Sequence, residues 1–191
     1  ISVKLNGFEK MHDGESFWNR HSPVLFPIVG KLKDGKTSIE GKTYEMGQHG
    51  FARDMEFEEI GEHSYVLKSN EETKKKFPFD FELYVSYSVS GNKLNTKYKV
   101  VNKSDRQMIF GLGGHPAYRC EYATGKYRLE FHDVEDEIEI YQLQDGLLKT
   151  IPEKVNKFIK ENRIFLDNKT FENDAIIMKN IKSRKVYLKT E

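Results

Sequence analysis

Apolar and polar side chains alternate with a period of two along one stretch of this chain. The apolar positions are Phe79, Phe81, Leu83, Val85, Tyr87 and Val89. Successive side chains of a β-strand point to opposite faces of the sheet, so this pattern predicts a strand with one buried face. Residues 90–93 (Ser-Gly-Asn-Lys) have turn composition, and the alternation resumes from Leu94 to Val100. The sequence therefore predicts a long antiparallel hairpin.

Further strand-like segments extend through the rest of the chain. They are Tyr44 to Met46, Met55 to Ile60, Tyr65 to Lys68, Met108 to Leu112, Tyr127 to Phe131, Glu137 to Leu143, Ala175 to Met178 and Lys185 to Leu188. Helical periodicity is scarce, and one short helical turn is expected at Glu153 to Lys160. Many short strands separated by Gly, Asn and Asp turns predict an all-β sandwich or barrel-like pair of sheets. We expect one domain over the 191 residues, because no repeat or linker interrupts them.

Charge and cysteine usage exclude several classes of partner. Lys and Arg number 31 against 30 Asp and Glu, and the two signs are interspersed, which argues against a nucleic-acid surface. The charged run from Glu71 to Lys76 is interpreted as a solvated loop. No apolar run approaches the length that crosses a membrane. The single cysteine, Cys120, cannot form an internal disulfide and is interpreted as a small apolar strand residue, so a reducing, cytoplasmic location is expected.

Two histidines stand in short glycine-flanked blocks. His49 lies within Gln48 to Asp54 (Gln-His-Gly-Phe-Ala-Arg-Asp), and His115 lies within Gly113 to Tyr118 (Gly-Gly-His-Pro-Ala-Tyr). The unperturbed pKa of histidine is close to neutrality, so it can give or take a proton under cellular conditions. The neighbouring glycines let another backbone or a ligand come close. This pattern favours proton-transfer chemistry on a small polar substrate, while a hydrogen-bonded core histidine is the alternative.

The segment from residue 17 to residue 30 differs from the strands. Its prolines at positions 23 and 27 are atypical of a regular paired strand. One interpretation is a loop that lines a cleft and presents Trp18 and Arg20. The other is a packed connector that fills the core with Leu25, Phe26 and Ile28.

Other kinds of site find little support in the sequence. The six histidines show no metal-binding spacing, so no metal is expected; they are His12, His21, His49, His63, His115 and His132. A serine hydrolase elbow is absent. Gly111 to Gly114 follows an expected strand without leading into a helix, which disfavours a nucleotide phosphate loop.

Four blocks together resemble those of a known family. In chain order they are residues 22–30 (Ser-Pro-Val-Leu-Phe-Pro-Ile-Val-Gly), 48–54, 114–118 and 171–175 (Phe-Glu-Asn-Asp-Ala). This series is similar to that of the aldose 1-epimerase (galactose mutarotase-like) family, in a bacterial branch close to hexose-6-phosphate epimerases. The resemblance extends from about Trp18 to the end of the chain.

The resemblance implies a large antiparallel β-sandwich that interconverts the α and β anomers of a hexose without a cofactor. In that chemistry a base removes the proton of the anomeric hydroxyl while an acid protonates the ring oxygen. The resemblance assigns the acid to His115 and places His49 on a sugar or ring oxygen. It assigns hydroxyl binding to Arg53 and Asp174, with a phosphate as an alternative ligand for Arg53. Asp174 as the cap of a turn, and Arg53 beside Asp54 as a surface ion pair, are the structural alternatives.

Three further cations or aromatic groups are candidate binding residues. Trp18 and Arg20 are expected at the rim of the site. Lys31 stands where relatives commonly carry arginine, and it keeps the charge but loses the planar fork that grips two oxygens. A hexose-6-phosphate epimerase would need several converging cations, and Arg53, Lys31 and Arg20 are the candidates.

The general base of the family is missing from the sequence. The resemblance places a glutamate there, usually before a proline, but none of the five prolines follows a Glu. We therefore expect an incomplete chain that lacks its native N-terminus and a C-terminal segment and leaves open sheet edges. A catalytically silent sugar-binding protein is the alternative from another functional class. The sequence identifies neither the sugar nor the oligomeric state.

Overall fold

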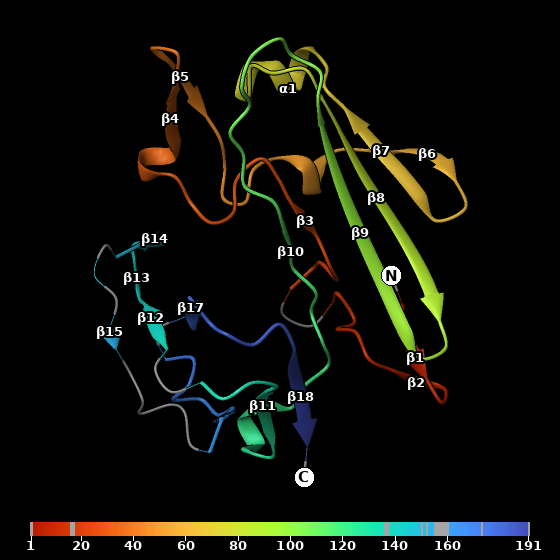
Figure 1. Cartoon of the computed structure of the whole chain (residues 1–191), viewed down its shortest axis with the longest axis vertical. Coiled ribbons are helices and arrows are strands. Elements are labelled where there is room, and N and C mark those ends of the chain that lie inside the picture. Colours follow the sequence, from red (N-terminus) through yellow and green to blue (C-terminus); the bar gives the residue numbers. More distant parts are fainter. Residues whose placement is uncertain are drawn as a thin grey trace. The chain divides into compact units, whose positions relative to one another are not determined.

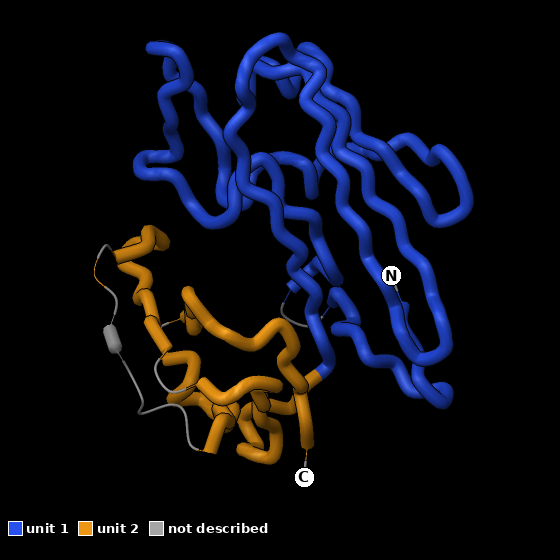
Figure 2. The backbone as a smooth tube through the Cα atoms, viewed as in Figure 1, with its two compact units in different colours: residues 1–119 blue, residues 120–191 orange. Residues whose placement is uncertain are grey.

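The structure is a computed structural model that separates into two compact units, residues 1–119 (unit 1) and residues 120–191 (unit 2) (Figure 2). Each unit is described by itself. The residues that the structure describes are 2–15, 18–135, 138–149, 151, 153–154, 161–172 and 174–190. The expectation of a single domain stays a prediction.

The predicted hairpin is confirmed as the longest pair of strands in unit 1 (Figure 1). β8 (Phe81–Ser90) and β9 (Lys93–Asn102) pair antiparallel along their whole length. β7 (Ser64–Lys68) pairs with β8 on its other side, and β6 (Glu58–Gly61) completes a sheet in the order β6-β7-β8-β9. The alternation from position 79 onward thus identified the framework of this unit.

One face of β8 forms the core of unit 1. Phe81, Leu83 and Val85 are each at most 3% exposed, and Phe26, which is fully buried, packs its ring 5.0 Å from that of Phe81. The remaining buried members of this cluster are Val24, Met46, Phe51, Ala52, Leu67, Phe77 and Phe79. The buried face of β8 does not continue to the turn as the sequence predicted, since Val89 is 74% exposed. Because Phe26 and Phe51 both belong to this core, it anchors the segment around Phe26 and the segment that contains His49.

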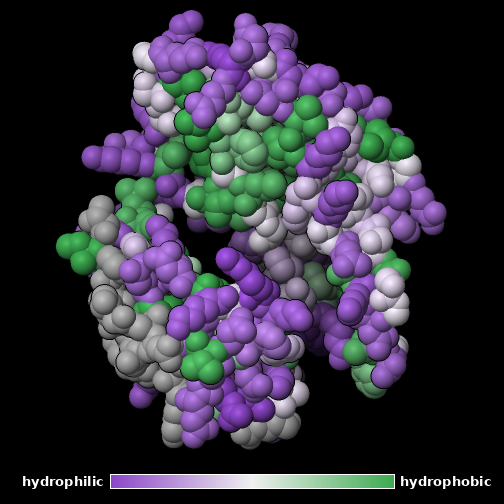
Figure 3. Space-filling view, viewed as in Figure 1, coloured by the Kyte–Doolittle hydropathy of each residue, from purple (hydrophilic) through white to green (hydrophobic). Residues whose placement is uncertain are grey.

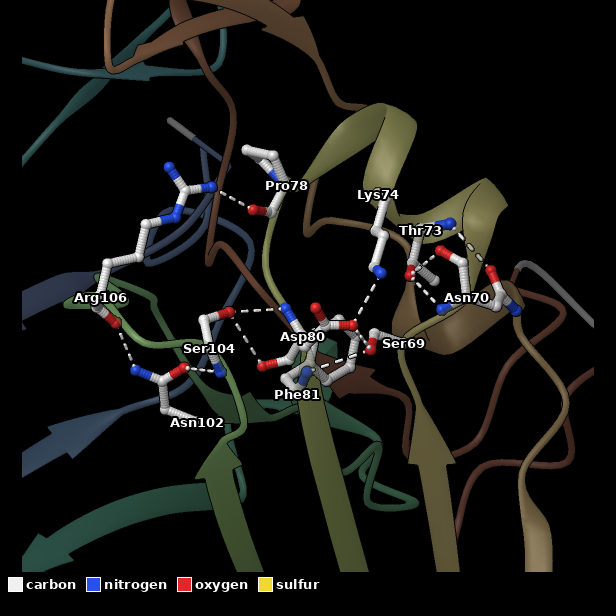
Figure 4. A network of polar contacts seen from close by, with 10 residues as sticks. All are labelled: Ser69, Asn70, Thr73, Lys74, Pro78, Asp80, Phe81, Asn102, Ser104 and Arg106. Atoms are coloured by element: carbon white, nitrogen blue, oxygen red, sulfur yellow. Dashed lines mark hydrogen bonds and ion pairs between the residues drawn. The ribbon is translucent and has the colours of Figure 1, made fainter.

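The charged run predicted as a loop is instead the helix α1 (Glu71–Lys76). Asn70 and Thr73 form a reciprocal capping box, with both hydrogen bonds 2.9 Å long. Glutamates in the first turn and lysines in the last turn also suit the helix dipole. Figure 4 shows Lys74 of this helix reaching Asp80, the residue before β8, with 2.8 Å between Nζ and Oδ1.

A short ladder replaces the strand predicted at Met108 to Leu112. Only β10 (Gly113–Gly114) pairs there, antiparallel to β3 (Val24–Leu25). Gly111 instead donates its N–H to the carbonyl of Pro27 at 2.7 Å. The prolines on the partner segment lack the N–H groups that a regular ladder needs. The segment from 24 to 28 is therefore largely the packed connector of our second interpretation.

The other elements of unit 1 are short. They are β1 (Lys4–Leu5), β2 (Phe8–Glu9), β4 (Lys36–Ile39), β5 (Lys42–Glu45) and the 3-10 turns η1 (Lys33–Gly35) and η2 (Ala52–Asp54). On the face drawn in Figure 3, hydrophobic side chains gather on unit 1 over the segment that leads into β10. Ile109 and Phe110 of that segment are 78% and 40% exposed.

Unit 2 contains two small three-stranded sheets around a second core. The central strands are β11 (Tyr127–Phe131) and β12 (Glu139–Tyr141). Their neighbours are β16 (Arg163–Phe165) and β18 (Val186–Thr190) beside β11, and β15 (Glu153–Lys154) and β17 (Ile177–Lys179) beside β12. The remaining elements are β13 (Leu143–Gln144), β14 (Leu147–Leu148) and η3 (Tyr122–Thr124). The buried core consists of Phe131, Ile138, Ile140, Ile164 and Leu166.

Three predictions for unit 2 have different outcomes. The helical turn expected at 153–160 is wrong at its start, which belongs to β15, and positions 155–160 lie outside the described residues. Glu137, the predicted start of a strand, also lies outside them. Cys120 is partly buried against the second core but is not in a strand, and burial raises the pKa of its thiol. A thiol with a raised pKa is a poor nucleophile near neutral pH.

Candidate functional site

The candidate site of unit 1 is held together by one backbone carbonyl, that of Phe26. It accepts hydrogen bonds from the N–H groups of Phe51 and Ala52 at 3.0 and 3.1 Å, and Phe26 forms a parallel bridge with Gly50. Gly50 has φ +74°, and a Cβ at this position would lie 2.2 Å from the same carbonyl oxygen. Only glycine therefore lets these two backbones approach so closely, and the approach places His49.

His49 is held by two hydrogen bonds to one residue. Its N–H donates to the carbonyl of Gly30 at 2.7 Å, and the N–H of Gly30 donates to Nδ1 of His49 at 3.0 Å. An Nδ1 that accepts a hydrogen bond carries no proton, so the neutral ring carries its proton on Nε2. Burial lowers the pKa of His49, and the charge of Arg53 and then the His115 ring lower it further. His49 is therefore a neutral hydrogen-bond donor near neutral pH.

His115 follows β10 directly, and its ring lies next to that of His49. Their ring centroids are 5.7 Å apart and the rings are nearly perpendicular, at 74°. The N–H of His115 donates to the carbonyl of Pro23 at 3.2 Å, which fixes its backbone. The residue is exposed, and its ring nitrogens make no hydrogen bond to any residue that the structure describes. These two histidines, 66 positions apart, are thus brought together with one ring available to a ligand.

Trp18 forms an aromatic wall beside His115. Its ring centroid lies 4.9 Å from that of His115, with 42° between the planes. Behind it, the buried His12 donates from Nε2 to the carbonyl of Trp18 at 2.8 Å. The sequence did not indicate a role for His12, because nothing local predicts a contact with the backbone six residues away. Aromatic faces of this kind stack on the apolar faces of sugars.

Arg53 and Arg20 meet at the turn η2. Nη2 of Arg53 donates to the carbonyl of Gln48 at 2.9 Å, and its Nε lies 3.7 Å from Oδ2 of Asp54. Nη2 of Arg20 lies 2.6 Å from Oδ1 of Asp54, and its Nη1 donates to the carbonyl of Arg53 at 3.3 Å. Arg53 and Asp54 are therefore more than an isolated surface pair. Arg20 connects to them across a sequence separation that no local pattern reveals.

The two other candidate binding residues are exposed. Lys31 follows Gly30, the residue that orients His49, and so stands next to the site along the chain. Asp174 belongs to unit 2, and there it has φ +75° and donates its N–H to the carbonyl of Phe171 at 3.0 Å. This backbone geometry is that of a turn, which agrees with the alternative interpretation of Asp174 as a turn residue. Roles in binding for both residues remain predictions.

The described part of the chain has neither a cluster of metal ligands nor a membrane-spanning helix. Among those residues, no three His, Cys, Asp or Glu side chains form a group that could hold a metal ion. Within the same residues, no helix has the length and apolar character that a membrane span requires.

Comparisons with known proteins agree on one family. The model of the family described as aldose 1-epimerase matches residues 3–190. The plasmid and chromosomal LacX proteins of Lactococcus lactis subsp. lactis are each 32% identical in an alignment of 189 positions, which covers 91% of this chain and 63% of theirs. This chain thus spans less than two thirds of the length of these curated relatives.

Solved structures extend the likeness to the fold. A galactose mutarotase related enzyme from Lactobacillus acidophilus has a TM-score of 0.86 and 36% identity, over 97% of this chain and 64% of that one. A galactose mutarotase-like protein from Lactobacillus casei has a TM-score of 0.85 and 30% identity, over 97% and 66%. The predicted all-β, mutarotase-like sandwich class is confirmed. The chain belongs to the aldose 1-epimerase family.

Proposed function

We propose that this protein is an isomerase that interconverts the α and β anomers of a hexose by acid–base ring opening. One observation carries the proposal above the others: His49 and His115 face each other at 5.7 Å between ring centroids, and the tautomer of His49 is set by Gly30. Family membership supports a sugar as the substrate. The matched relatives are longer, so the activity is proposed for the natural full-length protein.

The two histidines have different environments, which suits different roles. His115 is exposed, with ring nitrogens not bonded to described residues, so it can deliver a proton to the ring oxygen of a sugar. His49 is partly buried and neutral, so its Nε2–H can donate a hydrogen bond to a sugar oxygen without competing as the acid. A neutral hydrogen-bond donor beside an accessible histidine is an arrangement that suits an acid–base site.

The reaction can be written with every proton accounted for. A base takes the proton from the anomeric hydroxyl, and the electron pair forms a carbonyl at C1 as the bond from C1 to the ring oxygen breaks. His115 gives its proton to that ring oxygen. Rotation about the C1–C2 bond and closure from the other face then give the second anomer, with both protons returned. The resemblance assigns the base to a glutamate before a proline, a pair absent from these 191 residues.

The wall and the cations around the histidines indicate how a sugar would be held. Trp18 presents its ring beside His115, and Arg53 stands beside His49, where its charge can face hydroxyl or phosphate oxygens. The Nε of Arg53 is buried and makes no hydrogen bond to a described residue. That nitrogen lies 3.7 Å from Oδ2 of Asp54, and the guanidinium charge suits a phosphate as well as a hydroxyl, which makes a hexose 6-phosphate the second candidate substrate.

NMR exchange between anomers tests the proposal. The full-length protein is added to glucose, galactose or glucose 6-phosphate, and the exchange rate is compared with the spontaneous rate. Acceleration is expected for at least one sugar, and the preferred sugar distinguishes the free hexose from the phosphate. A matched control is His63→Asn, which changes a surface histidine that is 67% exposed, and it should leave the rate unchanged. Binding of sugar without any acceleration would support the silent sugar-binding alternative instead.

A further inference from the structure

Residues 12–15 and 18–21 form part of a loop, here called the clasp, whose two ends meet at a single residue. The N–H of His12 donates to the carbonyl of Ala117 at 2.9 Å, and the N–H of Ala117 donates to the carbonyl of His21 at 2.8 Å. Nδ1 of His21 also donates to the carbonyl of His12 at 2.8 Å. Because Ala117 lies two residues after His115, the clasp is fixed to the segment that carries that histidine.

Two side chains of the clasp contact different parts of the site. Trp18 contacts the segment that carries His115, and Arg20 contacts the turn that follows His49. Trp18 packs against the ring of His115. Arg20 bonds to the turn η2 through both terminal nitrogens, at 2.6 Å to Asp54 and 3.3 Å to the carbonyl of Arg53. That turn begins three residues after His49 and carries Arg53, whose charge acts on the His49 ring. The clasp therefore bridges the parts of the site that come from distant stretches of sequence.

We propose that Arg20 is a positioning residue, which holds Asp54 and the backbone of Arg53 so that His49 keeps its place relative to His115. The proposal rests on the proposed function where it concerns catalysis. A guanidinium suits this task because its rigid fork bonds to a carboxylate and a carbonyl together, which a lysine ammonium on a flexible stem does not do at fixed geometry. Because both terminal nitrogens bind the protein itself, Arg20 acts through Asp54 rather than on the sugar.

Small displacements in a site of this kind are costly, since a misplacement of about 1 Å can lower a rate about 100-fold. The ion pair is partly exposed, with Arg20 at 29% and Asp54 at 54%, which limits its strength. A loss of about two- to fivefold in kcat is therefore expected when either partner is removed. Only a small rise in KM should accompany this loss, because Arg53 moves with the released turn while the larger effect falls on kcat.

A double-mutant cycle separates a positioning role of Arg20 through Asp54 from a direct contact of Arg20 with the sugar. Arg20→Ala, Asp54→Ala and the double variant are compared in anomer exchange with glucose and with galactose. If Arg20 acts through Asp54, the double variant loses no more kcat than Arg20→Ala alone, and the loss is the same for both sugars. Losses that multiply, or a rise in KM with unchanged kcat, would overturn the proposal. Arg20→Lys should restore only part of the rate.

A matched control removes an ion pair elsewhere in unit 1. Lys68 and Glu58 form an exposed pair at 2.7 Å between β7 and β6, so Lys68→Ala tests whether losing any such pair lowers the rate. No change in kcat is expected. A loss as large as that of Arg20→Ala would contradict a specific role for Arg20.

A second readout does not require activity. The His49 ring is titrated by NMR in the wild-type protein and in Arg20→Ala. Release of the turn should let Arg53 move away, so the lowered pKa of His49 should move up toward its ordinary value. An unchanged His49 titration would overturn the positioning role. A shifted titration in a protein that accelerates no anomer exchange would support the positioning role while the proposed function fails.

Discussion

Gly50→Ala is the substitution whose effect the structure determines most sharply. The glycine has φ +74°, and a Cβ would lie 2.2 Å from the carbonyl oxygen of Phe26 and 2.7 Å from the nitrogen of Pro27. All of these neighbours are backbone atoms, which cannot rotate away as a side chain does. The bridge between the segments of residues 24–30 and 47–54 must therefore open.

The expected cost has two parts. An alanine in the left-handed region costs about 1–2 kcal/mol of unfolding free energy. Opening the bridge also disturbs the two hydrogen bonds that Phe26 accepts from Phe51 and Ala52, each worth about 0.5–1.5 kcal/mol. The free energy of unfolding should therefore fall by about 2–5 kcal/mol.

Gly41→Ala is a matched control. Gly41 has φ +78°, but no atom lies within 4 Å of the position that its Cβ would take, so it should lose only the backbone part, about 1–2 kcal/mol. Urea unfolding of both variants and the wild type measures the difference. With a slope of about 2 kcal/mol per M, the midpoint of Gly50→Ala should lie about 0.5–1.5 M below that of Gly41→Ala. Equal midpoints would refute the close-approach argument.

Three further outcomes are expected. The pKa of His49 in the folded protein lies below its ordinary value of 6.5, so between those two pKa values the unfolded chain binds more protons than the folded one. The free energy of unfolding should therefore rise with pH across that window. His49→Gln should flatten the rise, measured by urea unfolding at about pH 5 and about pH 8. Asn70→Ala removes the cap of α1 and should cost about 1 kcal/mol in the same assay, while anomer exchange stays at the wild-type rate. Trp18→Leu removes the ring contact with His115 and should lower the exchange rate several-fold with a small effect on stability; an unchanged rate would exclude the aromatic wall from the site.

Local patterns in the sequence predicted the strands better than the connections between them. The hairpin of β8 and β9 follows from alternation alone, because one side of it packs on a core. The helix α1 was missed because its capping pair, Asn70 next to the charged run and Thr73 within it, accompanies a composition that also suits a loop. The strand expected at 108–112 fails because its neighbour carries prolines, a constraint that comes from another part of the chain.

The site shows the same division. The histidine blocks stood out because glycine beside histidine is a local pattern, and the structure explains the glycine at position 50 by the approach of Phe26. The pair of Arg20 and Asp54 spans 34 residues, and the support that His12 gives to Trp18 depends on the course of the clasp. Neither has a local signal, so only the three-dimensional structure brings them into the site.

The most direct test of the central claim is the anomer exchange rate of His115→Asn in the full-length protein, measured by NMR beside its affinity for the same sugar. The rate should fall by about 10²–10⁴-fold, the usual contribution of one proton-transfer group, while affinity changes little. An exchange rate that stays at the wild-type value would contradict the assignment of His115 as the acid and, with it, the proposed mechanism.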